Sequence, residues 1–256
     1  MEAEISKQQA FVLAYSGHLQ QASKMSGSAV DLARQAAAPE RAALTETGAA
    51  LREAFFGNAP AATRDATEAL ALSKGRDVEY GAGLALALAG DASRAQILAN
   101  DLDKRFPEDT SVRFSYLPQL RAVLALNPPL KQRSDPAKAI ELLQVAVPYE
   151  LGVPLSWFSG FGALYPIYMR GEAFLAAGRG AEAAAEFQKI LDHRGIVATD
   201  PIGALARLQI GRAFHLSGND AKAKTAYQDF LALWQEADPD IPILLQAKAE
   251  YEKLQK

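Results

Sequence analysis

Histidine is the side chain used most often for acid–base chemistry and metal binding near neutral pH, and this chain has three: His18, His193 and His215. None pairs with another histidine or with an acid at the spacing of metal ligands. The glycine pairs at Gly81–Gly83 and Gly160–Gly162 are fragments of phosphate-loop patterns, but neither lies between an apparent strand and a helix. No serine has a nucleophile-elbow context, and the kinase motifs are missing. The sequence therefore predicts a chain that is not an enzyme, with no catalytic residues, no metal site and no cofactor.

The composition narrows the class of protein further. The 256 residues carry a net charge of −3, so no basic surplus attracts a nucleic acid. There is no cysteine, which excludes disulfides and thiolate metal sites. The apolar stretch Gly81–Gly90 is shorter than the roughly 20 residues of a membrane helix. We expect no membrane insertion by this chain and a cytoplasmic location, or an extracytoplasmic one if a membrane helix precedes Met1.

One spacing of glycine and alanine recurs along the whole chain. A glycine stands five residues before an alanine in five places: Gly17/Ala22, Gly57/Ala62, Gly90/Ala95, Gly178/Ala183 and Gly218/Ala223. A sixth copy is centred on Ala139, where Ser134 replaces the glycine. A pattern that recurs at intervals of about 30 to 45 residues is typical of proteins built from repeated structural units.

The spacing predicts helical hairpins, because the glycine supplies the positive-φ residue that ends one helix and the small alanine lets the next helix cross closely. The predicted fold is all-α, a right-handed superhelical solenoid of about six hairpins, since one hairpin cannot bury its own apolar face. We expect units at residues 1–38, 39–75, 76–108, 109–150, 160–200 and 201–237, and a capping helix at 241–255. Glu53 stands where its helix needs an apolar residue, so the frame of the second unit could slip.

The order of small residue, turn glycine, second small residue and later proline (Pro107) resembles the tetratricopeptide repeat, TPR. The resemblance covers nearly the whole chain, although most units exceed the usual period of about 34 residues. It implies a scaffold for protein–protein interaction that binds a protein or peptide in a concave groove.

The C-terminal half has a narrower resemblance. Residues 181–197 (AEAAAEFQKILDHRGIV), 200–206 (DPIGALA) and 227–243 (YQDFLALWQEADPDIPI), with Pro148–Gly152 upstream, look like the C-terminal repeat region of bacterial, notably acidobacterial, serine/threonine protein kinases. This resemblance implies a regulatory or substrate-recruiting region of a signalling kinase, without the kinase domain itself.

Side chains that face the predicted groove are the candidates for partner binding. They lie on the first helix of a hairpin, opposite the residues that pack on the second helix: Tyr80, Leu84, Tyr165, Tyr168, Glu172, Leu208, Arg212 and His215. Tyr168 and Arg212 are the leading candidates, because tyrosine gives contact area at low entropic cost and arginine binds carboxylates. The alternatives are packing between repeats for the tyrosines and a solvated face for the charges.

Insertions in repeat proteins map to loops and often to the binding face; here they fall at Asn127–Asp135, Pro148–Gly162 and His193–Gly203. Trp157 and Phe158 in the second insertion either anchor a partner or fill the core at the start of the next helix. His193 and Arg194 in the third either contact an anion or are cations favoured by a helix C-terminus. Two further functions stay open: a homodimer formed by self-association, and small-molecule sensing in the groove.

Overall fold

The structure is a computed structural model that describes residues 2–128, 133–152 and 161–255. Within these ranges all regular structure is helical and no β-strand is present, which confirms the all-α prediction. No helix in the described part of the chain combines the length and apolar character needed to cross a membrane.

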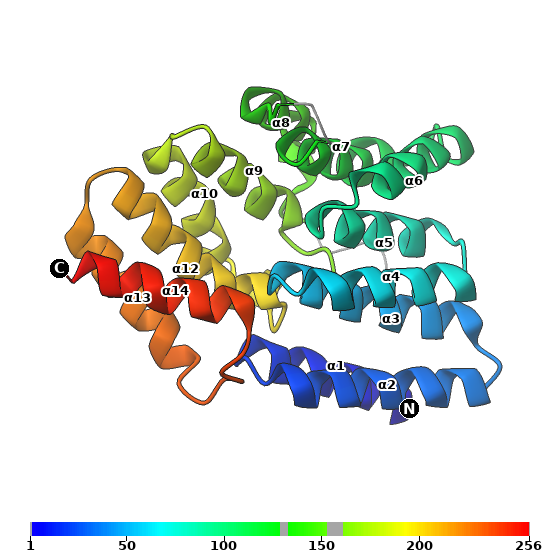
Figure 1. Ribbon diagram of the computed structural model, residues 1–256. Coiled ribbons are helices and arrows are strands. Elements are labelled where there is room, and N and C mark those ends of the chain that lie inside the picture. Colours follow the sequence, from blue (N-terminus) through cyan, green and yellow to red (C-terminus); the bar gives the residue numbers. More distant parts are fainter. Residues whose placement is uncertain (1, 129–132, 153–160, 256) are drawn as a thin grey trace.

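Successive helices pack in pairs along the chain (Figure 1). The first helices of the described pairs are α1 (Glu2–Tyr15), α3 (Pro39–Phe55), α5 (Arg76–Leu88), α7 (Leu117–Leu126), α9 (Tyr165–Ala176) and α12 (Pro201–Leu216). The second helices are α2 (Leu19–Gln35), α4 (Ala59–Leu72), α6 (Ala92–Arg105), α8 (Pro136–Leu143), α10 (Gly180–Asp192) and α13 (Asp220–Leu233). The other elements are a π-helical turn η1 (Val112–Tyr116), a 3-10 helix η2 (Gln144–Tyr149), α11 (Arg194–Val197) and α14 (Pro242–Leu254). Each second helix also packs on the first helix of the next pair.

The predicted turn glycines end the first helices as expected. Positive φ angles, between 72° and 90°, occur at Gly17, Gly57, Gly90, Gly178 and Gly218. The six alanines at the predicted crossing points, 22, 62, 95, 139, 183 and 223, are all 0% exposed. The predicted roles of these residues are therefore confirmed: a glycine with positive φ ends the first helix, and a buried alanine permits the close crossing of the second helix.

The frame of the second hairpin does not slip at Glu53. This residue lies buried on α3, where its carboxylate accepts hydrogen bonds from the Ser23 hydroxyl at 3.2 Å and from the Asn58 amide at 2.9 Å. These bonds compensate for the loss of water around a buried acid. Gly57 then ends the helix with φ 84°.

A second kind of glycine lies within the first helices, opposite an aromatic ring of the second helix. A Cβ atom added to Gly171 would lie 2.6 Å from the ring of Phe187, and one added to Gly211 would lie 3.1 Å from the ring of Tyr227. These glycines give the rings the space to pack directly on the backbone of α9 and α12.

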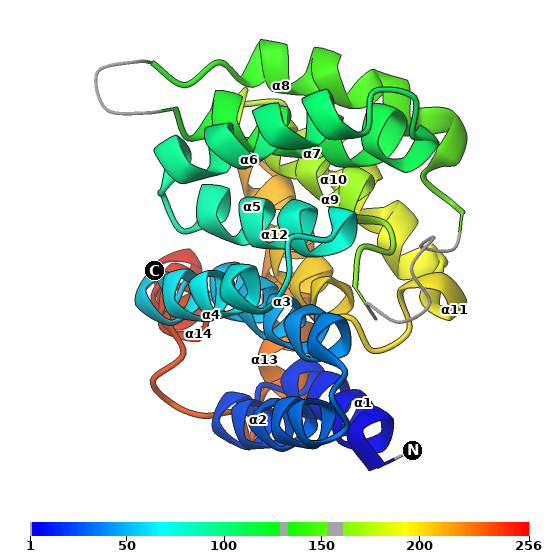
Figure 2. The ribbon, with the colours of Figure 1, turned by 90° about the vertical axis from the view of Figure 1, so that its right-hand side faces the viewer.

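The two ends of the array contact each other, a contact that we name the closure. The Trp234 indole N–H donates to the Tyr15 carbonyl oxygen at 3.0 Å, and its ring packs edge-on against Phe56 at 5.0 Å. The backbone N–H of Ile243 donates to the Phe56 carbonyl oxygen at 3.1 Å, which ties α14 to the end of α3. In Figure 1 the chain rises from α1 and α2 through α5 and α7, crosses at α8 and descends to α12–α14 beside its starting point; Figure 2 shows the same return from the side.

Candidate functional site

The predicted groove side chains are mostly interior. Tyr80, Leu84, Tyr165, Tyr168 and Leu208 are at most 4% exposed, so the prediction that they face an open groove is wrong, and packing is their role. The cause is contact between distant pairs of helices. The ring of Phe55 on α3 packs edge-on against Tyr165 and Tyr168 on α9, with ring centres 5.2 and 5.5 Å apart.

The charged candidates Glu172 and Arg212 are brought together, but α14 already holds the arginine. Arg212 donates from Nε and Nη2 to the carboxylate of Glu250 at 2.8 and 2.9 Å, and the Tyr227 hydroxyl donates to the same carboxylate at 2.8 Å. Burial raises the pKa of Glu172 to about 7, more than the attraction of Arg212 lowers it. Glu172 and Arg212 thus belong to a partly buried polar network that attaches α14 to α9 and α12.

The remaining candidates are peripheral or outside the described residues. His215 is exposed and lies 2.7 Å from a carboxylate oxygen of Asp220. His193 follows the last residue of α10, with its ring Nδ1 2.7 Å from the Lys189 carbonyl oxygen, which fits the helix C-terminal alternative. Arg194 is exposed. Trp157 and Phe158 lie outside the residues that the structure describes.

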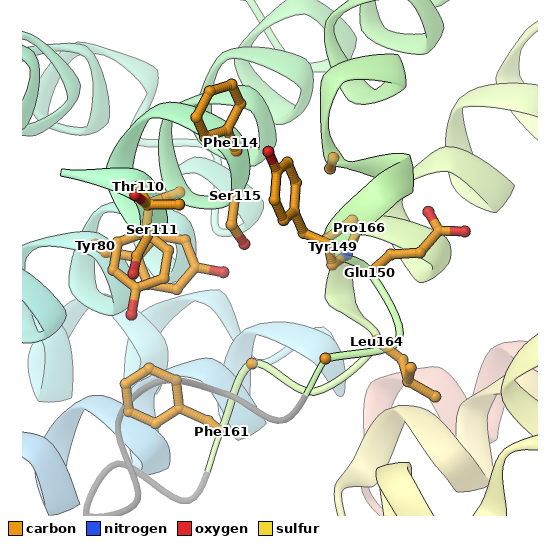
Figure 3. Close-up of a pocket in the computed structure, with 14 residues that line it drawn as sticks. Tyr80, Thr110, Ser111, Phe114, Ser115, Tyr149, Glu150, Phe161, Leu164 and Pro166 are labelled. Carbon is orange, nitrogen blue, oxygen red and sulfur yellow. The ribbon is translucent and has the colours of Figure 1, made fainter. Parts of the chain in front are cut away.

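A different feature has the character of a binding site: a cavity of about 90 Å³ between α5, η1, η2 and the start of α9, which we name the aromatic cavity (Figure 3). The rings of Tyr80 and Tyr116 form one wall, stacked 3.8 Å apart with 4° between their planes. Phe114 and Tyr149 form another, with ring centres 5.1 Å apart. Phe161 lies below them. Of the predicted binding residues in the described chain, only Tyr80 lines this cavity.

The π-helical turn η1 positions one side of the aromatic cavity. A π-helical turn is rare and is found frequently at functional sites, because its extra residue changes which side chains share a face. Asp109 fixes the start of η1, since its carboxylate accepts from the Val112 N–H at 3.0 Å and from Arg76 of α5 at 2.7 Å. Phe114 and Tyr116 were not predicted as site residues, and the only signal for them in the sequence is a pair of aromatic residues shortly after Asp109.

The polar groups of the aromatic cavity are hydroxyls. The Tyr80 hydroxyl donates to Gln119 at 2.8 Å, and Gln119 in turn donates to the Ser115 hydroxyl at 2.9 Å. Ser111 is only 5% exposed and lines the cavity, yet its hydroxyl makes no hydrogen bond with any described residue. The hydroxyl keeps contact with solvent, so a ligand that fills the cavity must replace the hydrogen bond that water supplies.

The aromatic cavity has little net charge. Among the described residues that line it, only Glu150 is charged. Its carboxylate lies 2.8 Å from Arg170 and 3.9 Å from Lys189 and is directed away from the cavity in Figure 3. Across the described residues, no group of three histidine or acidic side chains could hold a metal ion. The cavity is therefore suited to a neutral group with one hydrogen-bonding function.

Four exposed apolar side chains lie in η2 and just after it, the segment that supplies Ala146 and Tyr149 to the aromatic cavity. We name Val145, Val147, Tyr149 and Leu151 the apolar rim; each is between 42% and 50% exposed. Tyr149 belongs to both the rim and the cavity wall. Clusters of exposed apolar residues beside a pocket are typical of surfaces that bind another protein.

Comparison of the sequence with protein-family models finds no match, and comparison with curated proteins finds none either. The geometry of the chain carries the functional argument.

Proposed function

We propose that this chain is a non-catalytic scaffold for protein–protein interaction that captures a peptide or protein at the aromatic cavity and the apolar rim. The carrying observation is the Ser111 hydroxyl, which lines a cavity walled by aromatic rings and makes no hydrogen bond with any described residue. Aromatic pockets rimmed by apolar side chains are where interfaces concentrate their binding energy. The predicted groove is a weaker candidate, because its tyrosines and leucines are buried.

We also propose that the paired helices are TPR-like repeats wound into a right-handed superhelix. The positive-φ turn glycines and the buried alanines support this assignment. The resemblance of residues 181–243 supports a role as the regulatory or substrate-recruiting region of a bacterial serine/threonine kinase. Reading the parent gene upstream of Met1 tests this role, and a parent without a kinase domain would remove it.

The capture proposal is tested by filling the aromatic cavity. Ser111→Leu places an apolar side chain inside it, whereas the matched control Ser28→Leu adds the same side chain at an exposed position of α2. We expect immobilised Ser111→Leu to lose proteins that both the wild type and Ser28→Leu retain, as identified by mass spectrometry. Tyr149→Ala, at an exposed position, repeats the test if circular dichroism shows that Ser111→Leu is unfolded. Equal capture by all variants contradicts this choice of site.

One observation favours self-association as a second candidate function. Ile5 and Val12 are both exposed on α1, and the exposed residues between them, Gln8 and Gln9, carry no charge. In an antiparallel pair of two copies, Ile5 meets Val12 and the glutamine amides meet across the axis, with no like charges opposed. We expect Val12→Glu to abolish any concentration-dependent mass in light scattering, and Ile97→Glu on α6 to leave it unchanged. A constant monomer mass for the wild type removes this candidate.

A further inference from the structure

We infer that the aromatic cavity takes a branched aliphatic side chain, such as leucine, from a partner peptide whose backbone hydrogen-bonds to Ser111. This inference rests on the proposed capture function and names the chemistry of the ligand.

The size of the aromatic cavity favours an aliphatic group over an aromatic one. Its volume is about 90 Å³, whereas an apolar cavity that binds benzene has about 150 Å³. The walls resist expansion: Tyr80 is fully buried, stacked on Tyr116 and bonded to Gln119. The ring of Phe161 cannot move toward α5, because it already packs on the backbone at Gly81, where an added Cβ would lie 3.0 Å from the ring. A branched aliphatic side chain fits this space without moving a ring.

The charge around the aromatic cavity excludes an ionic anchor. A charged side chain would lose its water of hydration on entry and gain no ion pair in exchange, and the rings of Tyr116 and Phe114 already face the guanidinium groups of Arg76 and Arg113, at 5.8 and 5.4 Å. Glu150 is the one acidic residue in the described lining, but Arg170 and Lys189 already pair with its carboxylate. The anchor is therefore neutral.

The Ser111 hydroxyl favours a peptide over a plain hydrocarbon. A ligand that fills the cavity expels the water that would otherwise satisfy this hydroxyl, and a hydroxyl left without a hydrogen bond weakens binding. A peptide restores the bond through the N–H or carbonyl next to its anchor residue. A hydrocarbon chain has no such group and leaves the hydroxyl without a partner.

The apolar rim determines what flanks the anchor. Val145, Val147 and Leu151 are exposed within four residues of Tyr149, which lines the cavity. Apolar residues next to the anchor would cover them and remove their surface from water. The partner segment is thus a peptide with an aliphatic anchor and at least one apolar neighbour.

The test uses a displayed library of random 12-residue peptides selected on the wild-type chain and screened against Ser111→Leu. The tightest peptide that Ser111→Leu rejects is then synthesised with its anchor changed to alanine, phenylalanine or lysine, and each dissociation constant is measured by fluorescence anisotropy. Burying a leucine side chain contributes enough that its truncation to alanine should weaken binding roughly 10- to 100-fold. Phenylalanine and lysine should weaken it at least as much. Ser111→Ala should weaken the parent peptide several-fold, whereas Ser28→Ala should not.

The outcomes separate this inference from the function on which it rests. Peptides that Ser111→Leu rejects but that carry an aromatic or charged anchor overturn the ligand class and leave the capture function in place. Equal binding of the peptide to Ser111→Ala and wild type overturns the role of the hydroxyl. Selected peptides that bind Ser111→Leu as well as wild type overturn both the ligand class and the site. Tyr149→Ala replaces Ser111→Leu in each comparison if that variant does not fold.

Discussion

The protonation of Glu172 makes stability depend on pH in a predictable direction. Burial raises the pKa of this carboxyl from 4.5 to about 7, and the neighbouring Arg212 offsets only part of that rise, since its guanidinium is bonded to Glu250. In the unfolded chain Glu172 ionises at its ordinary pKa. The folded protein therefore holds a proton that the unfolded chain releases between about pH 4.5 and 7. The stabilisation is fully present below pH 4.5 and is lost as the pH rises through 7.

The size of this effect follows from the change in pKa. A rise from 4.5 to about 7 corresponds to about 3 kcal/mol of unfolding free energy, at about 1.4 kcal/mol per pH unit. Glu172→Gln keeps the shape of the side chain but cannot ionise. We expect the wild type to lose about 3 kcal/mol more stability than Glu172→Gln between pH 4.5 and pH 8. Other buried acids with a raised pKa, such as Asp200, remain in both proteins and cancel in the comparison.

Urea denaturation at several pH values between 4.5 and 8 measures this difference. The control is Glu141→Gln, an exposed position on α8, which should track the wild type. Glu250→Gln supplies an independent check: it releases Arg212 to compensate Glu172, so the pKa of Glu172 falls and the pH dependence shrinks. Identical pH profiles for the wild type and Glu172→Gln would refute the reasoning.

Three further predictions concern the packing of the chain. Gly27→Ala should stabilise the protein by about 0.5–1 kcal/mol, because an added Cβ meets nothing in the interior of α2; an unchanged or lower melting temperature contradicts this. Gly171→Ala should destabilise it by about 1–3 kcal/mol in the same assay, because the Cβ would overlap the ring of Phe187; a melting temperature equal to that of Gly27→Ala would show that the ring yields. Trp234→Ala should lower the free energy of unfolding by about 3–5 kcal/mol and should speed amide hydrogen exchange in α1 as well as in α13. If amide protection in α1 equals that of the wild type, the closure does not stabilise the first helix.

The spacing of glycine and alanine in the sequence predicted where the first helices end and where the paired helices cross. The glycine that ends a helix and the alanine at the crossing point are five residues apart, as Gly178 and Ala183 illustrate. A single short pattern in the sequence therefore indicates both features. The periodicity that placed Tyr165 and Tyr168 on one side of α9 also reflects a common environment, since both rings contact Phe55. What periodicity could not show is whether that side faces water or another helix.

The contacts that decided the exposure of the site join distant residues and have no local signature. Trp234 reads as an ordinary apolar residue at the end of a helix, and nothing near Tyr15 indicates that its carbonyl oxygen accepts from an indole 219 residues away. The π-helical turn also has no signal in the sequence, because Val112–Tyr116 contains no glycine or proline. The aromatic cavity forms only where α5, η1, η2 and the start of α9 meet, so no single segment of the sequence indicates that Phe114 and Ser111 line it.

The closure also affects how the chain can be made. A linear row of hairpins can complete each contact as soon as the next hairpin leaves the ribosome, but the indole that bonds to Tyr15 is synthesised 219 residues later. At 5–20 residues per second, the first hairpin is present for on the order of 10–40 s before its final neighbour exists. During that time the turn at Gly17, which Trp234 and Ala237 later cover, stays accessible to solvent and to chaperones. The contact between α1 and α13 therefore forms only after Trp234 has been synthesised.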